Sequence, residues 1–194
     1  MINGLKLKLR GLELSDAETI VKNWNSLELR SFLASKTPNS LEEEQEFIKA
    51  TWGMRKTGDI ALGIETLKEG KLIGTVGFNK LWSLTSGSAE VGIAIWEPEE
   101  RSKGYGTEAI FLLAFYAFEV LGLHRLQLHA MAFNKRGIKA YTKVGFKEIA
   151  RLREADYIYN KYQDMVLMEL LEGEMTYPDE LNKILDEYRK IPDS

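Results

Sequence analysis

Nine residues between a strand-like segment and a long apolar segment constrain this chain more than any other feature. The segment Arg101–Ala109 (RSKGYGTEA) follows the alternating run Ala89–Trp96 and overlaps the start of a helix expected over Thr107–Leu121. Gly104 and Gly106 allow the backbone to turn so that successive N–H groups point into one concavity, and the helix adds its unpaired N-terminal donors. The pattern predicts a strand, an anion-binding loop and a buried helix, in that order.

The spacing within this loop decides among the known phosphate-binding motifs. A P-loop needs G-x-x-x-x-G-K-[ST], and the chain lacks that pattern. The spacing from Gly104 to Ala109 matches the dinucleotide fingerprint, but the loop Glu97–Lys103 separates these glycines from the strand. The next expected strand, Arg125–Ala130, also lacks the acidic residue that would bind a ribose. A third pattern, R-x-x-G-x-G at the start of a helix, fits in full.

Composition excludes several other kinds of site. Cysteine is absent, which removes disulfides, thiolate nucleophiles and zinc–cysteine sites. His124 and His129 flank one expected strand without a ligand or nucleophile pattern, so we assign both a structural role and predict no metal site. A net charge of −3, from 26 basic and 29 acidic residues, argues against nucleic acid as a partner. The longest apolar run, Ala109–Phe118, is too short to cross a bilayer, so we expect a cytoplasmic protein with no membrane partner.

Hydrophobic periodicity predicts an α/β fold of the α+β type. Helix-capping signals include Ser15–Glu18, Ser40–Glu43 and Asn134, and Gly145 marks a helix end. A polar, tyrosine-rich loop is expected between the last two strands, which should then pair antiparallel. The expected strands are 5–10, 60–66, 72–81, 89–96, 125–130, 146–153 and 163–170, and the expected helices are 15–24, 40–56, 107–121, 134–144 and one after Pro178.

These residues resemble the GCN5-related N-acetyltransferase (GNAT) family over most of the chain. The matches are Arg101-x-x-Gly104-x-Gly106, then Asn134, then the segment Tyr141–Phe146. The segments 89–98 and 164–168 are similar to the branch that holds ribosomal-protein N-terminal alanine acetyltransferases and spermidine acetyltransferases. The resemblance implies a GNAT-like, mostly antiparallel twisted sheet flanked by helices, with acetyl-CoA as the cofactor. It also implies an acetyltransferase domain over 1–172 and a C-terminal helical extension over 173–194.

The resemblance implies how residues are arranged around acetyl-CoA. The glycine loop would bind the pyrophosphate, the edge of the strand 89–96 would pair with the pantetheine arm, and Asn134 would hold this arm from the other side. Arg136 and Lys139 are lesser candidates for the phosphates of the adenosine end. The expected cofactor-binding residues are Ile93, Ala94, Ile95, Arg101, Ser102, Lys103, Gly104, Tyr105, Gly106, Thr107, Asn134 and Tyr141.

Two positions depart from the family pattern. Ser102 stands where glycine is common, and its hydroxyl can also face a phosphate. Gly137 lies in the first turn of the helix capped by Asn134, where a glycine costs up to ~1 kcal/mol of helix stability. It either leaves room for the cofactor or moves the start of the helix.

Tyr141 and Glu90 are the expected catalytic residues. Tyr141 follows Asn134 by about two helical turns, so the two side chains share a face. The thioester sulfur gains negative charge as the acetyl group leaves, and a phenol can donate a hydrogen bond to it. The attacking amine must be neutral, and Glu90 is the first candidate for the base, directly or through water, with Glu65 second. The alternative for both acids is a solvated strand carboxylate.

The cost of deprotonation separates the candidate acceptors. At pH 7 it is about 4.6 kcal/mol for a lysine-like or polyamine nitrogen and roughly 1 kcal/mol for an α-amine. The leading hypothesis is therefore direct acetyl transfer to a protein or peptide N-terminus, and the alternative acceptor is a polyamine or other small cationic amine, which the acids Glu42, Glu43, Glu44 and Glu46 could attract. A hypothesis of another class is a non-catalytic acyl-CoA sensor or docking module. A homo-oligomer is a further expectation.

Overall fold

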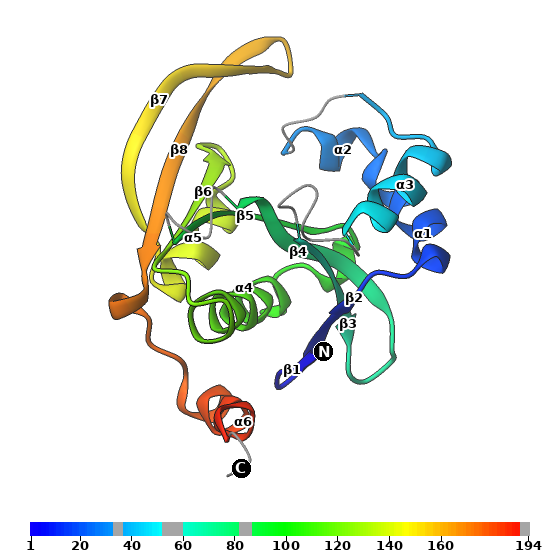
Figure 1. The fold of residues 1–194 in the computed structure, drawn as a ribbon. Helices are drawn as coiled ribbons and strands as arrows, with labels where there is room; N and C mark the ends of the chain where they lie inside the picture. Colours follow the sequence, from blue (N-terminus) through cyan, green and yellow to red (C-terminus); the bar gives the residue numbers. More distant parts are fainter. Residues whose placement is uncertain (33–36, 52–59, 82–86, 191–194) are drawn as a thin grey trace.

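Alternating apolar residues build one central sheet, as the sequence predicts. The structure, a computed structural model, describes residues 1–32, 37–51, 60–81 and 87–190, without the side chains of residues 79–81. In this part of the chain eight strands pair in the order β1-β2-β3-β4-β5-β6-β8-β7, with helices on both faces (Figure 1). The expected mixed, mostly antiparallel sheet flanked by helices is confirmed. The strands are β1 (Ile2–Asn3), β2 (Leu7–Gly11), β3 (Ile60–Thr66), β4 (Leu72–Leu81), β5 (Ser88–Ile95), β6 (Arg125–Met131), β7 (Lys147–Ile158) and β8 (Lys161–Leu171). The helices are α1 (Ala17–Trp24), α2 (Leu27–Arg30), α3 (Leu41–Thr51), α4 (Tyr105–Phe115), α5 (Lys135–Val144) and α6 (Asp179–Arg189).

The pairing of β5 with β6 is parallel and short. It joins Ser88–Glu90 to Arg125–Gln127, whereas the other neighbouring strands are antiparallel. On its other side β5 stays paired with β4 as far as Ile95. The two strands therefore part after Glu90, and the second half of β5 has no strand partner on the β6 side among the described residues.

The two faces of the sheet carry different layers. Ala89 and Val91 of β5 belong to the main core, which α4 completes with an almost wholly apolar surface. Ala94 and Trp96 point to the other face, where Ile48 of α3 is among their partners in a second core that also includes α1. Because side chains alternate along a strand, even-numbered residues of β5 face the α1–α3 side and odd-numbered residues face α4.

Helix boundaries follow capping chemistry more closely than periodicity. Ser40 and Glu43 form the predicted capping box, with Ser40 Oγ accepting from the Glu43 N–H at 3.1 Å. The box expected at Ser15 is wrong, because Asp16 accepts from the Glu13 N–H at 2.8 Å in a 3-10 turn that precedes α1. The helix expected over 107–121 begins at Tyr105 and becomes a single π turn after Phe115. Helix α3 is described as far as Thr51, and its expected continuation lies outside the described residues, as do positions 82–86 of the expected polar connection.

The expected loop between the last strands is wrong, because β7 and β8 form one long antiparallel hairpin. Tyr159 and Asn160, at φ 51° and 60°, make a two-residue turn in the left-handed region. Nearer the body, three residues of β7 oppose Asp164 in a bulge, where Glu154 has φ 51° and donates its N–H to Asp164 Oδ1 at 3.0 Å. The bulge bends the hairpin away from a flat sheet (Figure 1).

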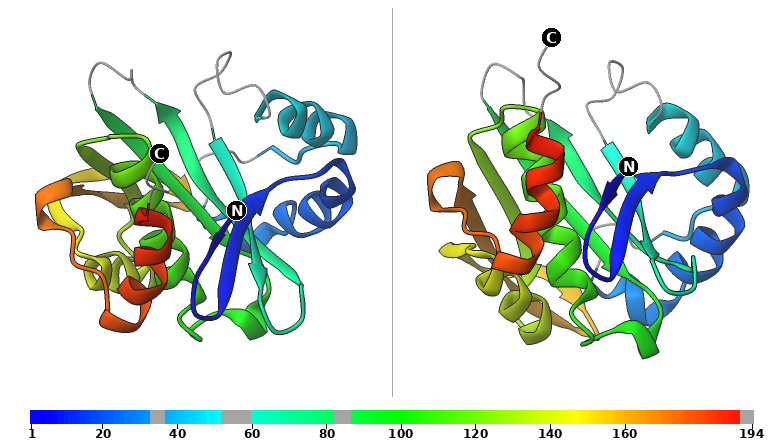
Figure 2. Two further views of the ribbon diagram at one scale, coloured as in Figure 1. Left: turned by 60° about the horizontal axis from the view of Figure 1, so that its bottom comes forward. Right: turned by 90° about the horizontal axis from the view of Figure 1, so that it is seen from below.

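Helix α6 packs on the body beside α4 (Figure 2). Leu181 and Leu185 are buried in the main core, and the Tyr188 hydroxyl accepts the Asn3 N–H at 2.8 Å. Arg189 donates to Glu119 at 2.5 Å and lies 5.5 Å from the centre of the Phe115 ring. Leu181 and Leu185 of this helix are thus covered by the chain itself, whereas Tyr188 is 41% exposed. The division into 1–172 and 173–194 remains a prediction. None of the helices in the described ranges has the length and apolar character of a membrane span.

Glu44 on α3 supplies a stability prediction. Its side chain is 5% exposed, and burial raises its pKa, although Asn39 donates to it at 3.3 Å. A carboxyl whose pKa is higher in the folded state weakens folding as the pH rises from its unfolded-state pKa to its folded-state pKa. Glu44→Gln should therefore raise the unfolding free energy at pH 7 by on the order of 1 kcal/mol, measured by urea denaturation. The gain should vanish at pH 3, and a gain that persists there would contradict burial of charge as the cause.

Candidate active site

The residues after β5 form a backbone concavity at the start of α4. Ser102 has φ 64° and Gly104 has φ 92°, both left-handed, and α4 begins at the next residue. Left-handed residues that alternate with ordinary ones direct successive N–H groups toward one side, and the free donors of the helix N-terminus add to them. Ser102 thus stands where the family commonly has glycine and adopts the left-handed conformation that glycine favours.

A cavity of about 150 Å³ adjoins this concavity between β5, α4 and α5. Its lining contains most of the expected cofactor-binding residues, Gly137, for which the sequence left a cofactor role open, and two residues that the sequence did not single out, Ile110 and Ala140. Lys103, Tyr105 and Ala94 are not among the lining residues. The full lining is Ile93, Ile95, Arg101, Ser102, Gly104, Gly106, Thr107, Ile110, Asn134, Arg136, Gly137, Ala140 and Tyr141.

Ile93, Ala94 and Ile95 of β5 are all expected to pair with the pantetheine arm, but their backbone groups point in different directions. The Trp96 N–H donates to the Ile73 carbonyl at 3.2 Å, and Ala94 lies opposite Thr75 in the same ladder. Since backbone groups alternate in direction along an antiparallel strand, those of Ala94 point to β4, whereas those of Ile93 and Ile95 point to the side where β6 has parted. Ile93 and the Ile95 N–H therefore offer the open edge, while the Ile95 carbonyl on the same side already accepts from Arg101 Nε at 3.1 Å.

Arg101 points back into the fold and not to the rim of the loop. Its Nε donates to the Ile95 carbonyl at 3.1 Å, and a terminal nitrogen donates to the Trp96 carbonyl at 2.9 Å. The other terminal nitrogen pairs with Glu28 on α2. Arg101 therefore clamps the end of β5 to α2 while it also lines the cavity. Lys103, by contrast, is half-exposed and pairs with Glu100 at 3.0 Å, which raises the Lys103 pKa.

Asn134 caps α5 with its side chain, and Gly137 makes this possible. Asn134 Oδ1 accepts the Gly137 N–H at 3.0 Å. A Cβ atom on Gly137 would lie 2.5 Å from Asn134 Nδ2, which is a clash. The unusual glycine therefore leaves room for the capping side chain, and α5 starts where predicted, at Lys135. Gly145, at φ 119°, ends the helix as expected.

Tyr141 lies in the wall of the cavity. Its side chain is 8% exposed, and its ring packs edge-on against Phe146 with 6.3 Å between centroids. Burial raises the pKa of Tyr141 to about 12. Its hydroxyl is thus protonated at any physiological pH and available as a hydrogen-bond donor.

The two candidate bases lie in different surroundings. Glu90 is the last residue of β5 that pairs with β6, and its side chain faces the α1–α3 side, opposite the cavity-lining isoleucines. Glu65 lies on β3, with β4 between it and β5, and pairs with Lys8 at 2.6 Å and Arg10 at 2.5 Å. Burial would raise the pKa of Glu65, but these two cations outweigh it and hold the pKa below its ordinary value. The structure therefore brings Glu90 to the parting of the strands and leaves Glu65 in an ion-pair network.

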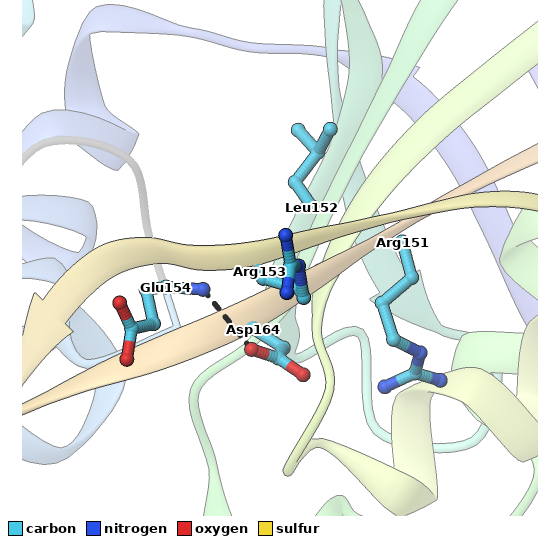
Figure 3. A pocket seen from close by; sticks show the side chains of 5 residues that line it. All are labelled: Arg151, Leu152, Arg153, Glu154 and Asp164. Carbon is cyan, nitrogen blue, oxygen red and sulfur yellow. Dashed lines mark hydrogen bonds between the residues drawn. The ribbon is translucent and has the colours of Figure 1, made fainter.

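A second hollow, of about 640 Å³, lies at the β7 bulge. Arg151, Leu152, Arg153, Glu154 and Asp164 line it, and Figure 3 shows Arg151 and Leu152 pointing to opposite sides of the strand. Charges of both signs line this hollow, and Asp164 is committed to the bulge. It has no feature that selects one kind of ligand.

Comparison with known proteins identifies the family. The acetyltransferase (GNAT) domain model matches residues 6–147. YdaF of Bacillus subtilis (strain 168), provisionally named a ribosomal N-acetyltransferase, is 32% identical over 174 residues, 87% of this chain and 92% of that protein. A crystal structure of spermidine N-acetyltransferase from Vibrio cholerae, in complex with CoA and spermine, has a TM-score of 0.78 and 28% identity and covers 87% of this chain and 96% of that one. A dodecameric structure of spermidine N-acetyltransferase from Vibrio cholerae has a TM-score of 0.73 and 28% identity, with coverage of 86% and 94%. These matches show that the chain belongs to the GNAT family of N-acetyltransferases, enzymes that use acetyl-CoA.

Proposed function

We propose that this acetyltransferase transfers the acetyl group of acetyl-CoA directly to the α-amine of a protein or peptide. The family assignment favours an enzyme over the non-catalytic sensor or docking module. When bound, acetyl-CoA supplies the acetyl group as a reactive thioester. The backbone donors of the segment 101–107 would bind its pyrophosphate, and the open edge at Ile93 and Ile95 would pair with its pantetheine arm. Tyr141 would donate a hydrogen bond to the leaving sulfur.

One observation carries the choice of acceptor: most of the other carboxylates on the α1–α3 side of the sheet are already paired or buried. Glu169, on the same face of the sheet as Glu90, pairs with Arg125 at 3.5 Å, and Glu28 pairs with Arg101. On α3, Glu43 accepts the Ser40 N–H at 2.7 Å, Glu44 is buried and Glu46 pairs with Lys49 at 2.8 Å, so Glu42 is the one of the four expected acids without a partner in the described part of the chain. A polyamine carries several ammonium groups and needs several available carboxylates, whereas an α-amine needs one base. The surroundings of Glu90 suit a single amine.

A polyamine is the second candidate. It is supported by the 28% identity and the TM-score of 0.78 to the spermidine N-acetyltransferase with bound spermine. A homo-oligomer is also part of the proposal, supported by the dodecameric relative, and a cytoplasmic location remains a prediction.

The two candidates differ in how rate depends on pH. The neutral amine is the attacking species, so kcat/KM for an α-amine should level off above pH 8, whereas kcat/KM for a polyamine should rise about tenfold per unit through pH 9. Thiol release from acetyl-CoA, measured with N-terminal peptides and with spermidine, tests this. At pH 7 we expect peptides to be favoured by about 10²-fold or more. Faster transfer to spermidine would contradict the proposed acceptor, and CoA binding without transfer to any amine would contradict the proposed reaction.

A further inference from the structure

Glu90 and His129 face each other where β5 and β6 part. His129 Nδ1 lies 3.7 Å from Glu90 Oε1. The parallel pairing ends with Glu90 opposite Gln127, so His129 stands two residues beyond the last paired position of β6. Its side chain thus spans the start of the gap between the strands.

Both side chains lie on the face of the sheet opposite the cofactor cavity. In β6, Leu128 and Ala130 are buried in the main core with α4, so His129 between them points the other way. Glu90 has the same orientation, because it lies between Ala89 and Val91, which belong to that core. The cavity-lining Ile93 and Ile95 face α4. An amine that approaches from the α1–α3 side would therefore meet Glu90 and His129 before it meets the thioester.

We propose that His129 is a positioning residue that acts through Glu90, taking up the proton that this carboxylate receives and passing it on to solvent. The inference rests on the proposed function. The Glu90 side chain is 19% exposed and that of His129 is 33% exposed, so an amine can reach the first and water can reach the second. A histidine with one nitrogen near a carboxylate and part of its ring in water is a suitable proton carrier.

One proton passes from the acceptor ammonium to water in this step, and both side chains return to their starting states. The acceptor ammonium gives one proton to the Glu90 carboxylate and becomes the neutral amine. The Glu90 carboxyl gives this proton to the unprotonated Nδ1 of His129, and the resulting imidazolium releases the proton on Nε2 to water. Glu90 is then a carboxylate again and His129 is neutral, ready for the next acceptor.

Other charges on this face leave the pair available. Arg125 on β6 lies opposite Leu171, and Glu169 on β8 lies opposite Gln127. The Arg125 and Glu169 side chains pair diagonally across the ladder at 3.5 Å. On the far side of His129, its ladder partner is Leu167 and the next is Met165 opposite Met131. The neighbours of His129 along this face of the ladder are thus the buried, uncharged Gln127 and the mutually neutralised ion pair on one side, and apolar residues on the other.

A double-mutant cycle tests whether His129 acts through Glu90. His129→Gln keeps a polar side chain beside the carboxylate but cannot carry a proton, so it should lower kcat by about tenfold. In the Glu90→Gln background, His129→Gln should lower kcat almost no further, because His129 then receives no proton from residue 90. CoA affinity, measured by calorimetry, should be equal in all four proteins.

Two further measurements separate a proton carrier from a packing residue. His124→Gln is the matched control, because the His124 side chain is 71% exposed and lies near Glu172, away from Glu90; it should leave kcat unchanged. Added imidazole should restore part of the kcat of His129→Ala and leave that of the double variant Glu90→Gln/His129→Ala unchanged, which loss of packing would not produce.

The outcomes distinguish this inference from the proposed function. A native protein that acetylates peptides while His129→Gln acts equally in both backgrounds, or has no effect on kcat, overturns the inference alone. Failure of imidazole to restore any activity to His129→Ala also overturns it. A native protein that transfers to no amine overturns the proposed function and this inference with it.

Discussion

Tyr141→Phe is expected to lower kcat by about 10²- to 10³-fold while CoA affinity stays nearly unchanged. The ring of Tyr141 packs against Phe146, and phenylalanine keeps this contact, so the loss is confined to the hydroxyl. With a pKa of about 12 for Tyr141 and roughly 8.5 for a thiol, moving the proton fully to the leaving sulfur would cost about 5 kcal/mol. Its contribution should therefore be a hydrogen bond to the developing negative charge, with the proton itself coming later from solvent.

Thiol release and calorimetry with CoA measure these two quantities separately. Tyr177→Phe is the matched control, since this tyrosine also packs among aromatic rings, 6.3 Å from both Phe111 and Phe115, but does not line the cavity. It should turn over like the native protein. If Tyr141→Phe retained native kcat with its melting temperature unchanged, the hydroxyl would have no part in the reaction.

The fold was predictable wherever the side-chain pattern and the backbone agreed. Strands β3 and β4 and helix α5 follow their periodicity and capping residues almost to the residue. The hairpin tip was missed because Tyr159 and Asn160 adopt left-handed conformations that usually require Asn-Gly or Gly-Gly, so the sequence looked like an open loop. Helix α2 was missed because four residues are too short for a period, and its one local signal is Ser26 Oγ, which accepts from the Leu29 N–H at 3.3 Å.

The candidate site was predictable where it is continuous in sequence. The glycine loop and the start of α4 form one backbone unit, so their residues indicated a concavity without knowledge of the tertiary structure. The direction of Arg101 was not predictable, because its partners are carbonyls exposed by the turn at Trp96 and a carboxylate on α2. The approach of His129 to Glu90 depends on the register of a three-residue parallel pairing between strands far apart in sequence. No local pattern encodes that register.

Gly106→Ala should raise the stability of the protein and lower its affinity for CoA. Gly106 lies in the first turn of α4, and an added Cβ would lie 3.5 Å from Ile95 Cδ1, an ordinary contact. Alanine is favoured over glycine within a helix by about 1 kcal/mol, so the unfolding free energy should rise by up to this amount. The same methyl group would project into the cavity beside the backbone donors and keep a pyrophosphate from approaching them, so the Kd for CoA should rise by about 10²-fold.

A variant that gains unfolding free energy but binds CoA more weakly shows that the glycine serves ligand binding and not folding. Urea denaturation without ligand and calorimetry with CoA give the two values on the same sample. Gly11→Ala is the control, because an added Cβ there meets nothing within 4 Å, and it should leave the Kd for CoA unchanged. If Gly106→Ala bound CoA as tightly as the native protein, the pyrophosphate could not lie against this turn of α4, and the proposed use of the segment 101–107 would be wrong.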